Sequence, residues 1–540
     1  MNRTVLSFGA VAVALAAVTG VAALSAPDEA AQGGESAKAA AHKPVERSTL
    51  VCPQPSASDV AETSYQAFTP KGTSGKKGSA ALYPAELAET DTPQSPADGK
   101  DGKNGEKNEK DEDNKGDKDK EDAGQQGRGG ETADKGSGKP FLPLSSPGTP
   151  VTADTDDPKA PALTGTADGP FAPGWTVQQT TSIAAGAGRG LQGTSCSVPD
   201  TSFWFPAVST AEDRQDYVHL TNPDSSSAVV DLELYGKKGK ERASQGAGEA
   251  ITVPPHSTVP VLLSTLTAEP VTNVTLHVTA RSGRVGAQVQ ASDRKLGGDW
   301  LPPATDPSSR LVLPGIPKDA ASVRLSVFAP GGEDADLKVK LAGRSGLISP
   351  AGYETLHVKA GMVTTVDLKD LTKGEAGSLV LSPTEDGEDA PGVVAAARVL
   401  RGKGGKQETA FIPATAPVQK RATAAGTSAT GATLALTAPE AGARVRVTAS
   451  PGSGGSPKST TVTVKGHTTK AFTPPRPTGA KGTCAVTVER LSGGPLYASR
   501  TLEREQSGLP AFTVQTLPDD RSTVAVPESA QDLSVLNDDK

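Results

Sequence analysis

The sequence predicts an all-β protein built of tandem immunoglobulin-like antiparallel β-sandwich repeats, with a disordered charged insertion. The first observation is a strand-like run that ends in proline and recurs three times, closing at Pro223, Pro330 and Pro439, which are 107 and 109 residues apart. The second is composition: aromatic residues make up only 4 % of the chain, which contains 59 Gly and 44 Pro. Short strands joined by many turns suit that composition better than one large core.

Each proline-ended run is followed by a segment in which apolar and charged residues alternate, at 230–234, 337–341 and 445–447. Such alternation is typical of strands with one buried face and one wet face. Strands of this length that repeat about every hundred residues indicate sandwiches of about seven strands. No helical period competes, and the alanine-rich run at 393–399 is interpreted as a strand.

The first 26 residues predict export. Arg3 precedes an uncharged, mostly apolar stretch at 4–24, and Asp28 and Glu29 follow it. A positively charged end stays inside while the rest of the chain crosses the membrane. The stretch is longer than a signal-peptide core of about 7–15 residues and close to the roughly 20 that span a bilayer. It predicts either a cleaved signal peptide or a retained signal anchor, so the chain is extracytoplasmic and either secreted or membrane-anchored.

Composition divides the rest of the chain. Between 98 and 139 charged residues of both signs alternate with glycine and asparagine, and this stretch cannot bury enough apolar surface to fold. The β-like stretches on either side form either one small N-terminal β unit or loose stalk segments. The predicted divisions are a disordered segment at 27–44, the first part of the N-terminal β unit at 45–96, a disordered charged and Pro-rich linker at 97–164, the second part of that unit at 165–200, and sandwich repeats at 201–305, 306–416 and 417–540. The last repeat ends in a C-terminal strand and tail, and residues 521–536 are expected to add an edge strand to it.

The chain has three cysteines, Cys52, Cys196 and Cys484. In an oxidising compartment they allow one disulfide and leave one thiol over. Cys52 and Cys196 are the candidate pair because both fall outside the repeats, and the alternative is three buried thiols. No Cys/His spacing indicates a metal site, and no motif indicates a cofactor.

Several short motifs carry a family resemblance. Besides the apolar N-terminal segment they are Leu50-Val51-Cys52-Pro53, Gly190-Leu191 leading to Cys196, Phe203-Trp204-Phe205, and 220–223 with 229–236 after it. Together they resemble an actinobacterial family of exported proteins that is known only as a domain of unknown function. The resemblance covers most of residues 45–520 apart from the charged insertion. That family has no assigned activity or catalytic residues, so the resemblance implies export and kinship but no chemistry.

The sequence shows no catalytic motif. It lacks a Gly-x-Ser-x-Gly elbow and a His-Glu-x-x-His motif, and its two Ser-x-x-Lys matches lack the companion motifs of a penicillin-binding site. His256 and His467 stand at equivalent turns where the second repeat has Gly361, which favours a turn role over catalysis. The candidates for stacking on a ligand are Trp204 and Trp300, with packing in the core or between domains as the alternative.

These observations predict a non-enzymatic cell-envelope or secreted protein with a binding or scaffolding role outside the membrane. The net charge is −7, with 55 basic and 62 acidic residues. This balance gives no electrostatic footprint for nucleic acid, which needs clustered Lys and Arg, so nucleic-acid binding is not expected. The expected form is a rigid rod of sandwiches on a flexible stalk, and the expected partner is an envelope protein or a glycan. The alternative is a cell-wall glycan-binding or glycan-active protein.

Overall fold

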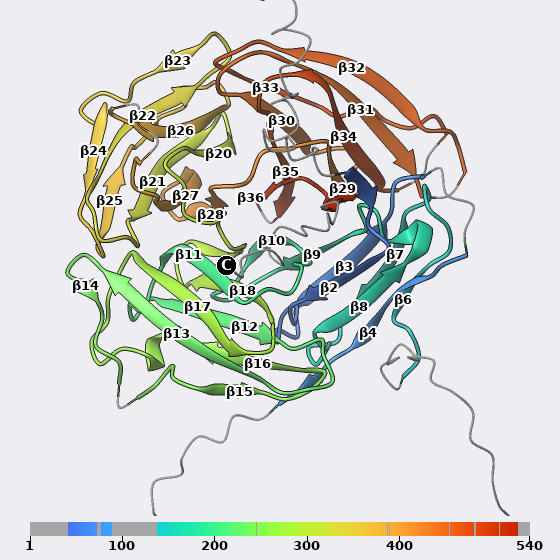
Figure 1. Cartoon of the computed structure of the whole chain (residues 1–540), viewed down its shortest axis with the longest axis horizontal. Helices are drawn as coiled ribbons and strands as arrows, with labels where there is room; N and C mark the ends of the chain where they lie inside the picture. Colours follow the sequence, from blue (N-terminus) through green and yellow to red (C-terminus); the bar gives the residue numbers. More distant parts are fainter. Residues whose placement is uncertain are drawn as a thin grey trace, which may run out of the picture. The chain divides into compact units, whose positions relative to one another are not determined.

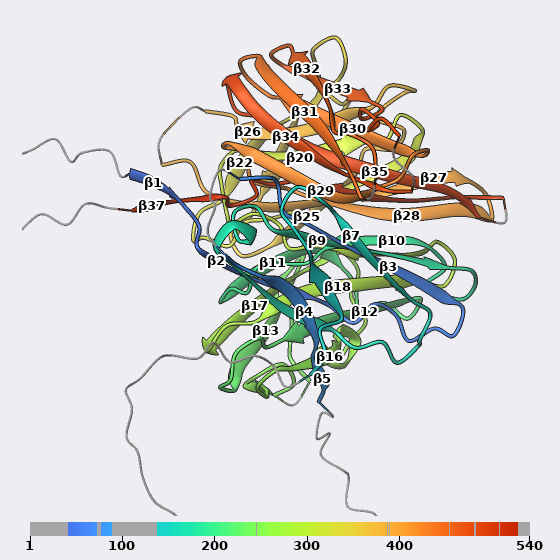
Figure 2. The same ribbon diagram turned by 90° about the vertical axis from the view of Figure 1, so that its right-hand side faces the viewer.

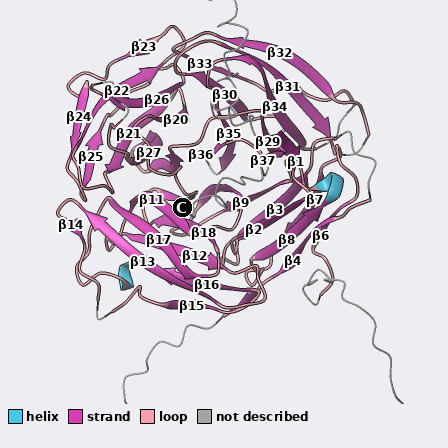
Figure 3. Cartoon of the chain, in the orientation of Figure 1, coloured by secondary structure: helices cyan, strands magenta, loops and turns pink. Residues whose placement is uncertain are grey.

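The computed structural model describes residues 41–72, 77–88, 138–244, 246–385, 387, 389–452, 454–479, 482–506 and 508–526. The predicted signal segment 1–26, residues 27–40 and most of the charged stretch lie outside the described residues. The chain divides into two compact units, one formed by residues 45–522 and one by the two ends of the chain. The helices of the described part are two short 3-10 turns, η2 (Gly169–Phe171) and η3 (Leu263–Thr265), and strands make up most of the rest (Figure 3). The predicted all-β class is confirmed.

The described strands of residues 45–522 form four sandwiches, which we call the N-terminal sandwich and sandwiches 1, 2 and 3 in chain order (Figure 1). The N-terminal sandwich contains β2 (Arg47–Cys52), β3 (Ala61–Phe68), β4 (Ala80–Pro84), β6 (Leu142–Leu144), β7 (Val151–Thr155), β8 (Leu163–Asp168), β9 (Thr176–Ile183) and β10 (Gly190–Ser195). Sandwich 1 contains β11 (Ser202–Val208), β12 (Arg214–Thr221), β13 (Ala228–Gly236), β14 (Gly239–Lys240), β15 (Ile251–Val253), β16 (Ser257–Leu262), β17 (Val274–Ser282), β18 (Gly286–Asp293) and β19 (Gly297–Leu301), and β5 (Glu86–Leu87) pairs in parallel with β16. Sandwich 2 contains β20 (Leu311–Ile316), β21 (Ala320–Phe328), β22 (Ala335–Ala342), β23 (Leu347–Ile348), β24 (Thr355–Val358), β25 (Val363–Asp367), β26 (Gly377–Pro383), β27 (Val394–Lys403) and β28 (Lys406–Pro413). Sandwich 3 contains β29 (Arg421–Thr427), β30 (Ala432–Ala438), β31 (Ala443–Pro451), β32 (Lys458–Val464), β33 (Thr468–Phe472), β34 (Cys484–Gly493), β35 (Tyr497–Gln506) and β36 (Leu509–Thr516).

All four sandwiches share one strand order. One sheet of each begins with an inner edge strand, in the orders β10-β9-β3-β7, β19-β18-β12-β16, β28-β27-β21-β25 and β36-β35-β30-β33. The other sheet has the orders β2-β8-β4-β6, β11-β17-β13-β14, β20-β26-β22-β23 and β29-β34-β31-β32. The prediction of tandem antiparallel sandwiches is confirmed, and the segments on both sides of the charged stretch form a sandwich equivalent to the repeats.

Alternation along the strands produces each core. In β13 every second residue from Ala228 to Gly236 is buried, as the sequence pattern predicts. In sandwich 2 the facing strands bring together Leu325, Val339 and Leu381. Each apolar side chain of this size that is removed from water contributes about 1.5–3 kcal/mol to stability.

Part of the predicted linker is folded. The strands β6 and β7 lie within 97–164, so the expectation of disorder is wrong for them. Both are edge strands, β6 pairing only with β4 and β7 only with β3. An edge strand needs partners for only half of its backbone groups, and it therefore tolerates residues such as Pro143 and Asp154.

The four sandwiches contact one another in a closed cycle. The strand β11 packs on β21 and β27, β20 packs on β30 and β35, β29 packs on β3 and β9, and β2 packs on β18. The inner strands β10, β19, β28 and β36 also contact one another, and β10, β28 and β36 lie near the middle of Figure 1. In a rod each sandwich contacts only its chain neighbours, so the contact of the N-terminal sandwich with sandwich 3 shows that the expected rod is wrong. The reason is that faces which a rod would leave wet carry apolar groups that need cover, such as Phe68 against Ala425.

The described ends of the chain form a separate two-stranded ladder (Figure 2). The strand β1 (Ala41–Pro44) pairs with β37 (Thr523–Val526) in antiparallel orientation. The expectation that 521–536 adds an edge strand to sandwich 3 is therefore wrong for its described part, and residues 41–44 of the segment predicted to be disordered form a strand. The inner edges of sandwich 3, β29 and β36, are already covered by neighbouring sandwiches, whereas the β-branched residues of β37 can pair with another open strand.

The predicted turn role of two histidines is confirmed. His256, Gly361 and His467 have φ angles of 51°, 68° and 61°. All three values lie in the left-handed region that glycine adopts most easily. The ring of His467 also holds this turn, because its Nδ1 hydrogen-bonds to the carbonyl oxygen of Pro439 at 2.8 Å.

Candidate functional site: the buried junction of the four inner strands

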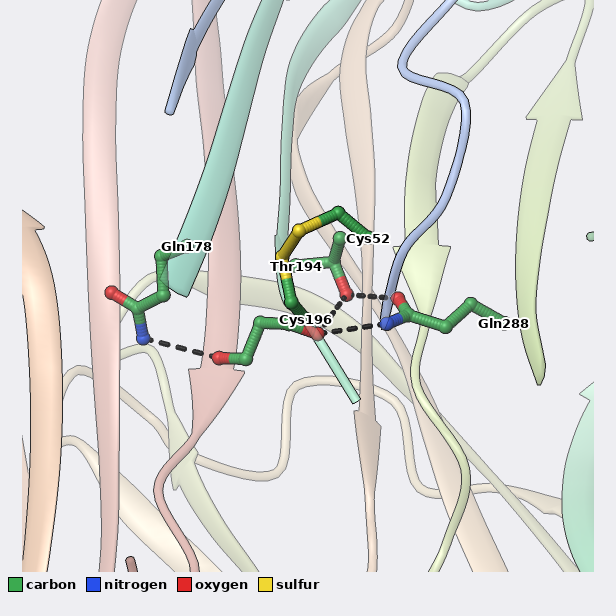
Figure 4. Close-up of a disulfide and its surroundings, with 6 residues drawn as sticks. Cys52, Gln178, Thr194, Cys196 and Gln288 are labelled. Atoms are coloured by element: carbon green, nitrogen blue, oxygen red, sulfur yellow. Dashed lines mark hydrogen bonds between the residues drawn. A yellow bond between two sulfur atoms is a disulfide. The ribbon is translucent and has the colours of Figure 1, made fainter. Parts of the chain in front are cut away.

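Cys52 and Cys196 form a disulfide, with an S–S distance of 1.99 Å (Figure 4). Beside it the N-terminal sandwich is hydrogen-bonded to sandwich 1. Gln288 Nε2 donates to the carbonyl of Ser195 at 2.8 Å, and the hydroxyl of Thr194 donates to Gln288 Oε1. The disulfide therefore holds the end of the inner strand β10 at the point where these two sandwiches meet.

The two tryptophans considered for ligand stacking lie in the interior. Trp204 is 8 % exposed, stacks on His277 with ring centroids 3.6 Å apart, and lies 5.6 Å from Phe328 of sandwich 2. Trp300 is 1 % exposed and lies 5.3 Å from His219. Rings buried this deeply are not accessible to a ligand that approaches from solvent. The stacking interpretation therefore does not fit their positions, and the alternative of packing in and between sandwiches does.

The junction is organised around Asp299, a fully buried carboxylate on β19. Its Oδ1 accepts hydrogen bonds from the backbone N–H of Gly193 on β10 at 3.0 Å and from the hydroxyl of Thr513 on β36 at 3.1 Å. The backbone N–H group of Trp300 also donates to it. One side chain thus bonds to the inner strands of the N-terminal sandwich and of sandwich 3.

The electrostatics of Asp299 favour its neutral form. Burial raises the pKa of Asp299 well above its usual range, and its hydrogen bonds lower it by less. Its Oδ2 has no hydrogen-bond partner among the described residues. A buried carboxylate without a cation is costly when it is charged. Its contribution is therefore to accept hydrogen bonds that no apolar side chain could accept, inside a region closed to substrates.

Arg500 on β35 is a second polar centre of the junction and is 1 % exposed. Its guanidinium donates to Thr427 Oγ1 at 2.8 Å, to the carbonyl of Ala425 and to Gln515 Oε1. It also donates to Gln178 Oε1 of the N-terminal sandwich at 2.5 Å. Burial lowers the pKa of Arg500 to about 9. The five donors of a guanidinium suit such a set of oxygens, and here they join the last sandwich to the first.

A buried ion pair and a cation–π contact join sandwiches 1 and 2. Arg398 on β27 pairs with Asp293 on β18 at 2.8 Å. Arg214 pairs with Asp216 of the same strand, β12, at 2.7 Å, and its guanidinium lies 5.6 Å from the ring centroid of Phe411 on β28. Removing one partner of a buried pair leaves an uncompensated charge. The contacts that Arg398 and Arg214 make across the boundary therefore favour one arrangement of the two sandwiches over others.

Glu408 on β28 lies where the N-terminal sandwich, sandwich 1 and sandwich 2 meet. Its side chain is 2 % exposed, and its Oε1 lies 3.2 Å from Nε of Arg189. Two glycines make room for the carboxylate, because a Cβ atom at Gly190 or Gly297 would lie 2.5 or 2.6 Å from Oε2. Burial raises the pKa of Glu408 to about 7, and the charge of Arg189 lowers it by less.

The raised pKa of Glu408 predicts a pH dependence of stability. The folded state holds the proton of Glu408 more tightly than the unfolded state, so this contribution to stability is fully present below the ordinary pKa of about 4.3. It is lost as the pH rises from there through about 7. Glu408→Gln should remove this part of the dependence, so that the variant loses less stability between pH 5 and 8 than the natural protein. Denaturant unfolding at the two pH values measures both losses, and equal losses would contradict the assignment.

Asp299, Glu408 and Arg500 were not identified from the sequence. The available signal is a charge within a largely apolar strand, as in Gly297-Gly298-Asp299-Trp300-Leu301. The sequence pattern of one strand does not indicate that both of its faces are buried, because the second face is buried by residues of other sandwiches.

The remaining thiol, Cys484, lies beside a small pocket of about 120 Å³ that is also lined by residues 473–477. Its side chain is buried, and burial raises the pKa of the Cys484 thiol. A thiol with a raised pKa is a poor nucleophile and a poor metal ligand. Cys484 is therefore interpreted as a buried packing residue of sandwich 3.

Two further properties concern the described part of the chain. It contains no group of three or more His, Cys, Asp or Glu residues placed to hold a metal ion. It also contains no helix that is long and apolar enough to cross a membrane. The apolar segment 4–24 lies outside the described residues.

Comparison with known proteins gives one match. A model described as a family of unknown function (DUF5719) matches residues 151–475, from β7 of the N-terminal sandwich into sandwich 3. No curated protein and no solved structure matches the chain. Because the match spans more than half of the sequence, the chain belongs to this family of unknown function, DUF5719.

Proposed function

We propose that the protein is exported and acts outside the membrane as a non-enzymatic platform that binds or scaffolds envelope components. The observation that carries the proposal is the junction itself. Its polar groups are buried and hydrogen-bond from one sandwich to the next, as Asp299 does to Gly193 and Thr513. Such a network fixes four sandwiches as one rigid body and leaves their outer faces and loops for partners.

Export is supported by the cysteines and the N-terminus. Structural disulfides form in oxidising compartments and are rare in the cytosol, and Cys52 and Cys196 form one. The apolar stretch at 4–24 follows Arg3 in the order of a signal peptide or signal anchor. An actinobacterial cell envelope is the setting that the family resemblance implies.

The alternative is a glycan-active protein. One observation favours it, the pKa of about 7 at Glu408, because a general acid in a glycosidase needs such a raised pKa. Glu408 is, however, enclosed by Arg189, Gly190 and Gly297. A polymer cannot reach a carboxylate in that position, so the observations support a binding platform better.

Cell fractionation tests the proposal. We expect the native protein to be degraded by protease added to intact cells, with Cys52 and Cys196 protected from thiol reagents unless a reductant is present. The mass of the mature N-terminus then separates the two forms: a chain beginning near residue 26 is secreted, and one retaining 4–24 is anchored. A protein that is protease-resistant in intact cells and has free thiols at both positions would contradict export.

A further inference from the structure

The outward-facing charges of one strand change from repeat to repeat. In β13 of sandwich 1 they are Asp231 and Glu233, in β22 of sandwich 2 they are Asp336, Lys338 and Lys340, and in β31 of sandwich 3 they are Arg444 and Arg446. The outward charges thus change from acids alone, through both signs, to arginines alone, although the buried residues between them stay apolar. Packing of the core does not require this change of charge, because the charged side chains are on the outer side of the sheet.

The charges are balanced in sandwich 1. Asp231 pairs with Arg281, and Glu233 pairs with Lys240 at 2.6 Å. Both pairs lie at the surface, where an ion pair contributes only about 0–1 kcal/mol to the stability of the fold. They do leave this face with little net charge.

The charges are not balanced in sandwich 3. Arg444 is exposed and pairs with no carboxylate in the described part of the chain. Arg446 pairs with Glu489 at 3.0 Å, and both side chains are half-exposed, so an incoming anion can compete for this arginine. Lys465 and Lys470 are exposed at the same edge, and Lys470 Nζ lies 3.4 Å from the carbonyl oxygen of Thr463. The face carries four cations against the carboxylate of Glu489 and that of the exposed Glu440, which lies at the turn beside Gly466, in a protein whose net charge is −7.

Rows of hydroxyl groups flank the arginines. Across the ladder, Arg444 is opposite Thr463 and Arg446 is opposite Thr461, both of which are exposed. Thr448 is opposite Ser459, with their hydroxyl oxygens 2.8 Å apart. These rows lie on β31 and β32, at the outer side of sandwich 3 in Figure 1. Arginines two residues apart on a strand are separated by about 6.8 Å along it, with hydroxyls one strand away.

We propose that this face of sandwich 3, the Arg444 face, binds a linear polymer that carries phosphate groups. A guanidinium presents a planar fork of donors that matches phosphate oxygens, and hydroxyl groups add further donors. Two arginines in line along one strand fit an extended chain with repeated anions better than a single small ion. The inference rests on the proposed function, since it names the class of envelope component that the platform binds.

Binding of inorganic polyphosphate to the full chain tests the proposal. The test variant is Arg444→Gln/Arg446→Gln, and the matched control is Lys338→Gln/Lys340→Gln, which removes the same charge from the outward side of the corresponding strand of sandwich 2. We expect the test variant to bind about 10-fold or more weakly, with a salt dependence reduced by about 0.7–0.9 per lost contact. The control variant should stay within about 2-fold of the natural protein. Both pairs are at the surface, so circular dichroism and unfolding midpoints should not change.

Three outcomes would overturn the proposal. Equal weakening by both variants would show attraction to general charge without a preferred face. Tighter binding to poly-L-glutamate than to polyphosphate would show that phosphate is not the recognised group. Arginine-dependent binding to phosphatidylglycerol vesicles without binding to polyphosphate would assign the face to a lipid surface. If fractionation places the protein outside the membrane and polyphosphate does not bind, this inference fails while the proposed function stands.

Discussion

Asp299→Ala should lower the free energy of unfolding by at least about 3 kcal/mol. The substitution leaves the backbone N–H groups of Gly193 and Trp300 and the hydroxyl of Thr513 without their acceptor. Each buried donor left unsatisfied costs about 1–3 kcal/mol, and the site is too enclosed for bulk water to replace the carboxylate. Because the donors belong to three sandwiches, hydrogen exchange should speed up in the inner strands β10 and β36 and not in β19 alone.

Asp299→Asn is the matched control. Asparagine keeps the acceptor oxygen that corresponds to Oδ1, and its amide replaces an Oδ2 that has no hydrogen-bond partner in the described residues. Since the raised pKa of Asp299 already favours the neutral form, the change should cost no more than about 1–2 kcal/mol. If Asp299→Ala does not fold, Thr513→Val, which removes one of the three donors, provides a milder test, with an expected loss of about 1 kcal/mol. Equal stability of the alanine and asparagine variants in denaturant unfolding would show that the hydrogen bonds at Asp299 do not hold the junction.

The strands and their repeat could be predicted from the sequence because each sandwich carries its own local pattern. Alternation such as that of 230–234 reports which side chains face the core, and every repeat contains it. The fourth copy was also detectable. Leu50-Val51-Cys52-Pro53 has the same apolar run ending in proline as Phe203-Trp204-Phe205-Pro206, and both runs lie in the first strand of a sandwich. Pro53 follows the end of β2, and Pro206 lies two residues before the end of β11. The charged insertion concealed the copy because it breaks the period.

The junction could not be predicted because its residues are buried by contacts between sandwiches that are far apart in the sequence. The alternation of apolar and polar residues indicates which side chains of a strand face the core of its own sandwich. It carries no information on whether a neighbouring sandwich buries the opposite face of that strand. Glu408 follows a lysine and a glutamine at the start of β28. Such a run of polar residues predicts a strand end that is exposed to solvent. Only the closed cycle buries Glu408, by bringing Gly190 and Gly297 against its carboxylate. Arg500 is similar, since its partner Gln178 precedes it by 322 residues.

Loss of the disulfide is the other change with a large expected effect. Cys52→Ser/Cys196→Ser should lower the free energy of unfolding by about 2–5 kcal/mol. The two cysteines are 144 residues apart, and the loop that they close includes the whole charged stretch. A loop of that length restricts the unfolded chain strongly, and the entropic gain approaches about 5 kcal/mol when the native geometry is unstrained. Denaturant unfolding of the oxidised, reduced and double-serine proteins measures the difference.

The location of the loss distinguishes this explanation from a general weakening. The disulfide restricts the unfolded state of the whole closed loop, and in the folded state it holds the end of β10 beside Gln288 of sandwich 1. Hydrogen exchange should therefore speed up most in β2, β8, β9 and β10, and less in sandwich 2. Cys484→Ser is the matched control, because it changes a buried thiol that closes no loop and should cost about 1 kcal/mol or less. If both serine variants were equally destabilised, the effect would come from burying a hydroxyl. The disulfide would then contribute little to holding the first sandwich in the cycle.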